Sequence, residues 1–244
     1  MDGGIGLPVR CVHTPVKTRW RMRGAVASEK LRNIYAALAR RYDVQHRLLT
    51  FASDARGRRL VVAKTVQAGD TVLDAGAGTG ATGIAAAVTA GPSGHVTLFD
   101  FSEDMLDVAR RKAQASKLGG RLDFVTGDML SLPFADAHFD VVLSTYSICP
   151  LFDPEKGTME LYRVLKPGGL LGVAHSVSPD GRLMHRLAER LEDAIWHFPG
   201  ISMGCRAVSV LPALERAGAE LVFTRRLGVP LYPFLVFVIR KPDL

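Results

Sequence analysis

The sequence contains no run of about 18 uninterrupted apolar residues, so it predicts no membrane-spanning helix. Its most apolar stretch, Val229 to Ile239, is interrupted by Pro230 and Pro233 and is too short to cross a bilayer, so we interpret it as a buried strand. The chain has 244 residues, 48% of them hydrophobic, which is enough to build a full core. This length suits one α/β domain with an appended segment better than two full domains.

Cysteine is scarce: the chain has three, at Cys11, Cys149 and Cys205. Their spacing is not that of metal ligands, and three cysteines do not make the disulfide framework of a small secreted protein. We therefore expect no metal site and a reducing compartment, which for this chain means the cytoplasm.

Acidic residues are almost absent from the first 26 positions, where Asp2 stands against five basic residues: Arg10, Lys17, Arg19, Arg21 and Arg23. This stretch also lacks the apolar core of a secretory signal. We predict that residues 1–27 form a disordered basic arm. The whole chain carries a formal charge of +7, which suits a plain basic soluble protein but also attraction to an anionic membrane surface or to nucleic acid.

Strand and helix patterns alternate from residue 28 onward. Helices are expected over 28–42, 44–61, 81–90, 102–117, 154–165, 182–196 and 209–217, with Ser28 and Ser102 as N-caps, and strands over 71–74, 95–100, 121–126, 140–145, 169–175, 219–225 and 231–240. This alternation predicts a doubly wound, mostly parallel seven-stranded α/β sheet of the Rossmann-like type. The last two strands are too close for a crossover helix, so they should form an antiparallel hairpin at one edge. Within the domain 28–244 we expect a helical lid (28–60), a cofactor-binding core (71–176), and a substrate-cover helix with the hairpin (177–244).

A glycine-rich turn follows the first expected strand, in the sequence Val72-Leu73-Asp74-Ala75-Gly76-Ala77-Gly78-Thr79-Gly80. Glycine permits a tight turn and lets the backbone approach a ligand closely. In open α/β sheets, ligands bind beyond the carboxyl ends of the strands, which is where this turn lies. Read one glycine later, the stretch Gly78-x-Gly80-x-x-Gly83 also matches the dinucleotide fingerprint, so NAD(P) is a rival cofactor.

Charge favours S-adenosylmethionine (SAM) over the dinucleotide. A carboxylate at Asp74 would repel a pyrophosphate, whereas it attracts the ammonium and sulfonium groups of SAM. The glycines that follow it are spaced Gly76-x-Gly78-x-Gly80, which is the methyltransferase spacing. We therefore predict SAM as the cofactor and S-adenosylhomocysteine as the product.

Further candidates follow the next two expected strands. Asp100 ends the second strand, the position that binds ribose hydroxyls, although it could instead be a helix N-terminal acid. Asp128 follows the third strand and is placed to meet the adenine amino group. Phe101 and Met129 could sandwich the adenine ring, or could belong to the core.

These segments resemble the motif series of class I SAM-dependent methyltransferases: Asp74–Gly80, Asp100, Gly127-Asp128, 132–134, 139–140 and 163–169. Within that class the chain resembles the ubiquinone/menaquinone biosynthesis C-methyltransferase (UbiE-like) group, whose N-terminal helices are similar to Tyr42-Asp43 and Leu48-Leu49-Thr50-Phe51. The resemblance covers residues 28–176. It implies a quinone-type acceptor methylated on carbon, and contacts to SAM from five residues: Thr79, Asp100, Asp128, Met129 and Thr145.

The chain departs from that group in places. Cys149-Pro150 stands where the group usually carries Arg-Asn, and His46 stands where Asn follows Tyr-Asp. The segment 144–149 and Gly204-Cys205 also resemble phospholipid N- and thiol S-methyltransferases, which stay open as alternatives. An RNA or DNA methyltransferase is disfavoured because residues 144–147 lack the Asn/Asp-Pro-Pro-aromatic motif, so we expect no nucleic-acid partner. A SAM-binding protein without catalysis is a further alternative.

Methylation of a hydroxyl or carbon acid needs a general base. The candidates near the strand ends are Tyr42, His46, Tyr146 and His175. Each has a competing interpretation: Tyr42 as a lid over SAM, His46 on a solvated helix face, Tyr146 as pocket lining, and His175 as a structural histidine. Cys149 precedes a proline, the reverse of the Pro-Cys order in RNA 5-methylcytosine enzymes, so we do not interpret it as a nucleophile.

An apolar stripe runs along the expected helix 182–196, formed by Leu183, Leu187, Leu191 and Ile195. The helix could pack on the sheet, cover an apolar substrate or contact a membrane surface. Further apolar surface comes from Trp196, Phe198, Tyr232 and Phe234. We expect a small hydrophobic or lipid-like substrate; the oligomeric state, a homodimer included, stays open.

Overall fold

The computed structural model describes residues 28–39, 41–50, 53–198, 202 and 204–243. The basic arm predicted for residues 1–27, with Cys11, lies outside the described residues, as do Phe51 and the side chain of Ser28 with its predicted N-cap.

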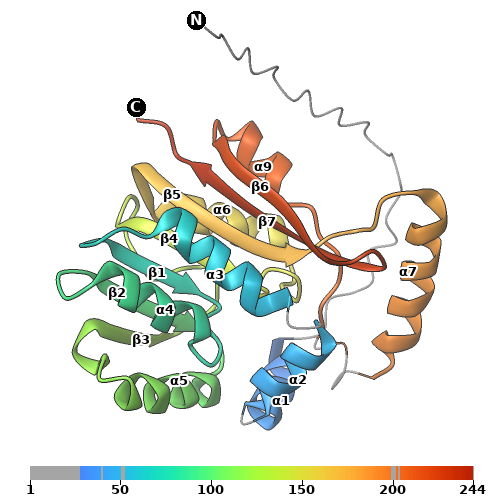
Figure 1. Ribbon diagram of the computed structural model, residues 1–244, viewed down its shortest axis with the longest axis horizontal. Helices are drawn as coiled ribbons and strands as arrows, with labels where there is room; N and C mark the ends of the chain where they lie inside the picture. The colour runs from blue at the N-terminus through green and yellow to red at the C-terminus, as the bar shows by residue number, and fades with distance from the viewer. Residues whose placement is uncertain (1–27, 40, 51–52, 199–201, 203, 244) are drawn as a thin grey trace, which may run out of the picture.

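A seven-stranded sheet forms the centre of the molecule (Figure 1), in the order β3-β2-β1-β4-β5-β7-β6. Its strands are β1 (Thr71–Ala75), β2 (His95–Asp100), β3 (Leu122–Thr126), β4 (Phe139–Thr145), β5 (Leu165–Ser176), β6 (Glu220–Val229) and β7 (Tyr232–Arg240). The first five strands are parallel, whereas β7 pairs antiparallel with both β5 and β6. The predicted mostly parallel sheet with an antiparallel edge hairpin is thus confirmed.

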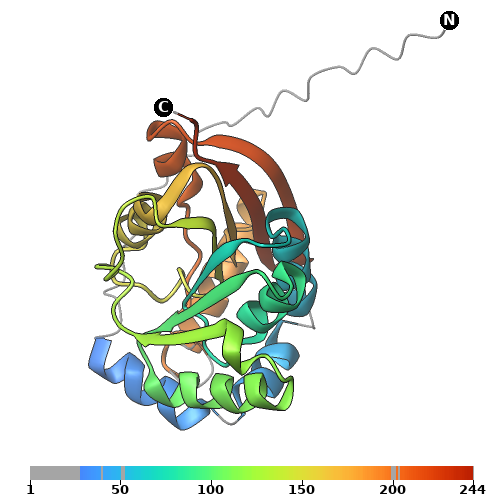
Figure 2. The ribbon, with the colours of Figure 1, turned by 90° about the vertical axis from the view of Figure 1, so that its left-hand side faces the viewer.

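Helices cover both faces of the sheet (Figure 2). The helices of the described residues are α1 (Ser28–Leu38), α2 (Tyr42–Leu49), α3 (Ser53–Thr65), α4 (Ala81–Ala90), α5 (Glu103–Ala115), α6 (Pro154–Val164), α7 (Arg182–Trp196) and α9 (Leu211–Arg216), with a short 3-10 turn η1 at Gly119–Arg121. Neighbouring strand residues point to opposite faces, so Val72 packs with α3, α4 and α5, whereas Leu73 packs with α6 and α9. Both side chains are fully buried, as expected for strands covered on both sides.

The helix predicted over residues 44–61 is wrong, because two helices, α2 and α3, share this region. Thr50 ends α2: its hydroxyl donates to the His46 carbonyl oxygen at 2.8 Å and to Asp54 Oδ1 at 3.0 Å. A threonine whose hydroxyl bonds the backbone and a neighbouring carboxylate competes with the continuation of a helix.

The fifth strand begins at Leu165, four residues before the predicted start at Gly169. Leu165 pairs with Phe139, and the register then shifts so that Val141 pairs with Leu170. The bulge absorbs Pro167 and the glycines after it, residue types that otherwise indicate a turn.

Two helical predictions are corrected by side-chain placement. Ser102 precedes α5 as predicted, but its side chain makes no capping bond, and its buried hydroxyl has no partner among the described residues. Helix α7 has the predicted bounds but stands beside the end of the sheet (Figure 1), with Leu183 68% and Leu187 and Leu191 each 41% exposed. The interpretation of α7 as a helix packed on the sheet is therefore wrong.

Among the described residues, no helix combines the length and the apolarity that a bilayer crossing needs.

Candidate functional site

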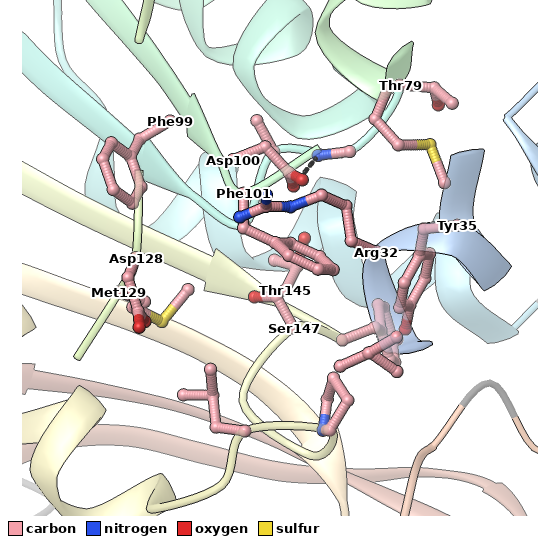
Figure 3. Close-up of a pocket in the computed structure, with 18 of the residues that line it drawn as sticks. Arg32, Tyr35, Thr79, Phe99, Asp100, Phe101, Asp128, Met129, Thr145 and Ser147 are labelled. Carbon is pink, nitrogen blue, oxygen red and sulfur yellow. Dashed lines mark hydrogen bonds between the residues drawn. The ribbon is translucent and has the colours of Figure 1, made fainter. Parts of the chain in front are cut away.

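A pocket opens beyond the carboxyl ends of β1, β2 and β4 and is bordered by α1 and α2 (Figure 3). Strand order reverses between β1 and β4, so this is the topological switch point at which doubly wound sheets bind ligands. The lining includes all predicted cofactor residues except Asp74 and Gly80: Gly76, Gly78, Thr79, Asp100, Phe101, Asp128, Met129 and Thr145.

The glycine turn has the backbone that only glycine adopts easily. Gly76 has a φ of +73°, and a Cβ there would lie 2.2 Å from the Cβ of Ser147. Gly78 has a φ of +53°, and nothing lies within 4 Å of the place of its Cβ. Gly80 instead packs under α5, where a Cβ would lie 2.8 Å from that of Ala109. The turn therefore leaves its backbone open to the pocket at Gly78.

Asp100 is a buried carboxylate at the rim of this turn. Its Oδ2 accepts a hydrogen bond from the Gly78 N–H at 2.8 Å (Figure 3), and its Oδ1 accepts one from the Ser102 N–H at 2.9 Å. Burial raises the pKa of Asp100 to about 6, although these backbone bonds favour the ionised form. The group is thus an ionised acceptor at neutral pH and also organises the start of α5, so both interpretations of it fit the structure.

Asp74 does not reach the pocket. Its side chain is fully buried and, because strand residues alternate, points toward α4 on the same face as Val72. Burial raises its pKa to about 7, while the nearby Arg58 guanidinium and the Gly83 N–H favour the charged form. Neither carboxylate oxygen meets hydrogen-bond geometry with any group in the described part of the chain. The sequence suggested that Asp74 attracts the positive groups of SAM directly. This prediction is wrong, because the carboxylate lies behind the turn.

Arg58 of α3 is a pocket residue that the sequence did not single out. Its guanidinium donates to Thr82 Oγ1 at 3.0 Å and to Thr145 Oγ1 at 2.8 Å, and lies 5.1 Å from the ring centroid of Tyr146. The side chain is only 13% exposed. The one feature of the sequence that points to Arg58 is Asp54, four residues earlier on the same helix. In the structure, Asp54 Oδ2 lies 4.0 Å from Arg58 Nε.

Aromatic side chains form a second wall of the pocket. Tyr42 and Tyr146 line it, whereas His46 lies behind them, stacked on Tyr42 and edge-on to Tyr146, with centroid distances of 5.3 Å in both cases. His46 is 5% exposed and its Nδ1 lies 3.2 Å from Asp54 Oδ2. The alternative of a solvated helix face is therefore wrong for His46, whose pKa is lowered by burial.

The two tyrosines are unsuited to removing protons. Burial raises the pKa of Tyr42 and of Tyr146, so both hydroxyls keep their protons at neutral pH. Tyr42 can donate a hydrogen bond to an oxygen on a ligand, whereas the Tyr146 hydroxyl donates to the Ser53 carbonyl oxygen at 3.4 Å. Gly57 makes room for this wall, because a Cβ there would lie 2.2 Å from the Tyr146 hydroxyl oxygen.

His175 is placed as a structural histidine. It is 1% exposed, its Nδ1 lies 2.9 Å from the Ser176 carbonyl oxygen, and its ring packs edge-on against Phe237. Burial lowers its pKa to about 4, so it stays neutral. It is not among the residues that line the pocket.

A polar contact ties the N-terminal helices to the glycine turn. Thr79 Oγ1 donates to Asp43 Oδ1 at 2.5 Å, and Lys112 of α5 forms an ion pair with the same carboxylate. Asp43 is a second residue that the sequence analysis did not place at the site. This contact closes the pocket on the side of α2.

The lining fits SAM better than a dinucleotide. A pyrophosphate needs free N–H groups on the turn, but the Gly78 N–H is already bonded to the Asp100 carboxylate, which would also repel it. Ribose hydroxyls can instead donate to Asp100. The lining also offers a carboxylate acceptor, Asp128, and the apolar side chains Phe101 and Met129, which are residue types that suit a purine.

The model of the ubiE/COQ5 methyltransferase family matches residues 23–190. The chain belongs to this family. It is 34% identical over 152 residues to the ubiquinone/menaquinone biosynthesis C-methyltransferase UbiE of Geotalea daltonii, covering 62% of this chain and 65% of that protein. It is 40% identical over 147 residues to the demethylmenaquinone methyltransferase of Thermus thermophilus, covering 60% of this chain and 66% of that protein. The chain thus spans less than two thirds of the length of these relatives.

A solved structure supports the fold. A SAM-dependent methyltransferase from Aquifex aeolicus superimposes with a TM-score of 0.60 at 22% identity, covering 84% of this chain and 98% of that one. The chain is therefore a UbiE-like member of the class I methyltransferase fold.

Proposed function

We propose that this protein is a SAM-dependent methyltransferase that methylates a carbon atom of a hydrophobic, quinone-like acceptor. The observation that carries the proposal is one pocket whose lining combines polar residues suited to SAM with apolar and aromatic side chains, among them Leu31, Tyr35, Tyr42, Leu151 and Phe152. Two relatives, the ubiquinone/menaquinone biosynthesis C-methyltransferase UbiE and a demethylmenaquinone methyltransferase, support a quinone-like acceptor by their names.

The polar lining residues would hold the cofactor. Asp100 would accept hydrogen bonds from the ribose, and Asp128 from the adenine amino group, with Phe101 and Met129 flanking the ring. Arg58 would bind the carboxylate of the methionine part, since it is the buried guanidinium beside the turn. When bound, SAM supplies a methyl group already activated on a cationic sulfur.

The apolar and aromatic lining residues would align the acceptor and exclude water. Tyr42 keeps its proton and so would orient an acceptor oxygen by donating a hydrogen bond. The Tyr146 hydroxyl donates to the Ser53 carbonyl oxygen, so this residue would offer the acceptor the face of its ring. His46, which lies behind them and is held by Asp54, would act as a positioning residue for the two rings rather than as a base in contact with the acceptor.

We also propose that the protein is cytoplasmic and contacts a membrane surface, where apolar quinones are dissolved. Two exposed apolar groups support this contact: Val44 and Leu48 of α2, 66% and 72% exposed, and the leucines of α7. Helix α7 carries exposed Arg186 and Arg190 beside its leucines, the pattern of an interfacial helix.

Labelled SAM offered with reduced demethylated quinones, phospholipids, small thiols and tRNA tests the proposed reaction. We expect the label in the quinone arm. It should be bound to a ring carbon, so that mild hydrolysis of the product does not release it. Label confined to the phospholipid, thiol or tRNA arm would show that the acceptor belongs to that class and not to the quinones. Titration calorimetry with SAM and NADH tests the cofactor separately, and heat with NADH alone would refute it.

A further inference from the structure

Helix α1 brings a positive charge to the pocket that the proposed binding of SAM does not use. Arg32 lines the pocket together with Leu31 and Tyr35 of the same helix. Residues three and four positions apart lie on one face of a helix, so Arg32 and Leu31 both stand beside Tyr35. Figure 3 shows the Arg32 side chain extended from α1 in the direction of Asp100 and Phe101. The face of α1 that borders the pocket therefore combines one guanidinium with two apolar side chains.

The Arg32 guanidinium is available to a ligand. It makes no hydrogen bond or ion pair with any residue in the described part of the chain. The second guanidinium of the lining, Arg58, is buried and donates to two threonine hydroxyls. The other charged residues among the described lining are the carboxylates Asp100 and Asp128. Because Arg32 is exposed and a guanidinium carries five N–H donors, a ligand in the pocket can reach several of them.

The described lining offers no group that is free to take a proton from the acceptor. Its tyrosines are Tyr35, Tyr42 and Tyr146, and burial raises the pKa of all three, so their hydroxyls stay protonated. Neither His46 nor His175 lines the pocket, and the two lining carboxylates would be engaged by the cofactor. A phenol ring, however, attacks through carbon most readily once its hydroxyl has lost the proton. The site must therefore favour the ionised acceptor in another way.

We propose that Arg32 binds the ionised hydroxyl of the acceptor and stabilises the negative charge from which the ring carbon attacks. This role rests on the proposed C-methylation of a quinone-like acceptor in its reduced form. The acceptor hydroxyl gives its proton to water, and the resulting oxyanion accepts hydrogen bonds from the guanidinium. The ring carbon beside this oxygen bonds to the methyl carbon of SAM, the bond from that carbon to sulfur breaks, and its electron pair stays on the sulfur of S-adenosylhomocysteine. The ring carbon then loses its own proton to water, and the oxygen takes up a proton again on release, so each turnover sets one proton free.

The surroundings of Arg32 suit this role. An opposite charge within about 4–6 Å lowers the pKa of an acid by roughly one to three. Because Arg32 reaches solvent, we expect the lower end of this range. An acceptor packed against Leu31 and Tyr35 would displace water from the guanidinium, which strengthens its attraction for an oxyanion. Arginine also stays charged at every pH at which the protein is folded and active.

The ionisation of a bound phenol tests this role without requiring methyl transfer. The probe is 1-naphthol, whose ionised form absorbs at longer wavelength than its neutral form, titrated from neutral to alkaline pH with the full chain saturated with S-adenosylhomocysteine. We expect a lower pKa for the bound probe than for the free probe. Arg32→Gln should raise the pKa of the bound probe by about one, whereas Arg32→Lys, which keeps the charge, should retain most of the lowering. The same pKa in the natural protein and in Arg32→Gln would overturn the proposal.

Lys30→Gln is the matched control, because Lys30 is an exposed cation of α1 that is not among the lining residues. It should leave the pKa of the bound probe unchanged. An equal rise in the Lys30 and Arg32 variants would contradict a direct contact, since it would trace the effect to the net charge of α1.

Titration calorimetry with S-adenosylhomocysteine separates the acceptor role of Arg32 from a role in holding the cofactor. Arg32→Gln should bind this ligand as the natural protein does. Weaker binding together with an unchanged pKa of the probe would assign Arg32 to the cofactor and refute the proposal. If the probe behaves as expected but reduced quinones are not methylated, the proposed acceptor is wrong while the binding of an oxyanion by Arg32 stands.

Discussion

The proposed cofactor site depends on one buried carboxylate. Asp100 already accepts two backbone hydrogen bonds, from Gly78 and Ser102, and these fix the direction in which its remaining acceptor capacity points. A rigid, ionised acceptor at a strand end discriminates strongly between ligands with and without matching hydroxyl groups.

Replacing Asp100 with alanine should therefore weaken SAM binding by about 1–3 kcal/mol, the loss typical of a charged hydrogen-bond acceptor. Titration calorimetry measures the affinity. Asp123→Ala is the matched control, because this carboxylate lies on β3 away from the lining, is 65% exposed and pairs only with His95 among the contacts described. Unchanged affinity in the Asp100 variant would show that Asp100 does not hold the cofactor.

Asp74 provides a prediction about pH. Its pKa rises from 3.8 to about 7 on folding, so the folded state binds a proton more tightly than the unfolded state. Stability contributed by the protonated form is present at low pH and is lost as pH rises through this window. Compared with Asp74→Asn, the natural protein should lose about 2–3 kcal/mol of unfolding free energy between pH 5 and pH 8, at roughly 1.4 kcal/mol for each pH unit below the folded pKa. Urea denaturation at both pH values without SAM measures the difference; equal losses in the two proteins would contradict it.

Residue patterns predicted which polar residues lie together at the pocket, because side chains at the ends of parallel strands follow directly from the strand positions. They did not reveal Arg58, since the three arginines of α3 look alike in the sequence and only the packing of that helix selects the one that turns inward. The direction of the Asp74 side chain was misjudged for a related reason. Side chains alternate between the two faces of β1, and this alternation places the Asp74 carboxylate behind the turn.

At the scale of elements, α3 does more than cover the sheet. It carries Arg58 into the pocket, offers Asp54 to His46, and approaches the ring of Tyr146 at Gly57. Its apolar periodicity is weak, so the sequence merged it with α2; the break depends on the side chain of Thr50. Elements with a clear signal, such as the alanine-rich α4 and the leucine stripe of α7, were predicted with the bounds that the structure has.

Gly57→Ala tests the close approach of α3. Alanine normally stabilises a helix by about 1 kcal/mol over glycine, but here its Cβ would overlap the Tyr146 hydroxyl. We expect a loss of about 1–3 kcal/mol of stability from overpacking, measured by denaturation, together with slower methyl transfer. Gly120→Ala, where nothing lies within 4 Å, is the control. A stabilised and fully active Gly57 variant would refute the contact.

At the scale of the whole molecule, the exposed apolar residues are not scattered evenly. Helices α1, α2 and α7 gather at one end of the sheet (Figure 1), and this end also holds the mouth of the pocket, where Phe152 is 69% exposed. With a net charge of +7, an anionic bilayer surface would attract the molecule as a whole.

Leu187→Asp should therefore reduce binding to vesicles of anionic phospholipid by about tenfold, because it removes roughly 1.5 kcal/mol of apolar burial. Sedimentation with the vesicles measures the bound fraction, and added salt should weaken binding further. Val88→Asp, at a 64% exposed position on α4, is the matched control and should bind normally. Equal binding by both variants would show that α7 does not contact the membrane.

The position of β7 has a consequence for the order in which the protein can be assembled. This strand follows all the others in the chain, yet it lies between β5 and β6. During synthesis, β1 to β5 and the pocket wall can form before β7 is made, so that one edge of β5 is still unpaired. An open strand edge invites pairing with other chains. The nascent chain is therefore most vulnerable to aggregation just before the ribosome releases residues 232–240.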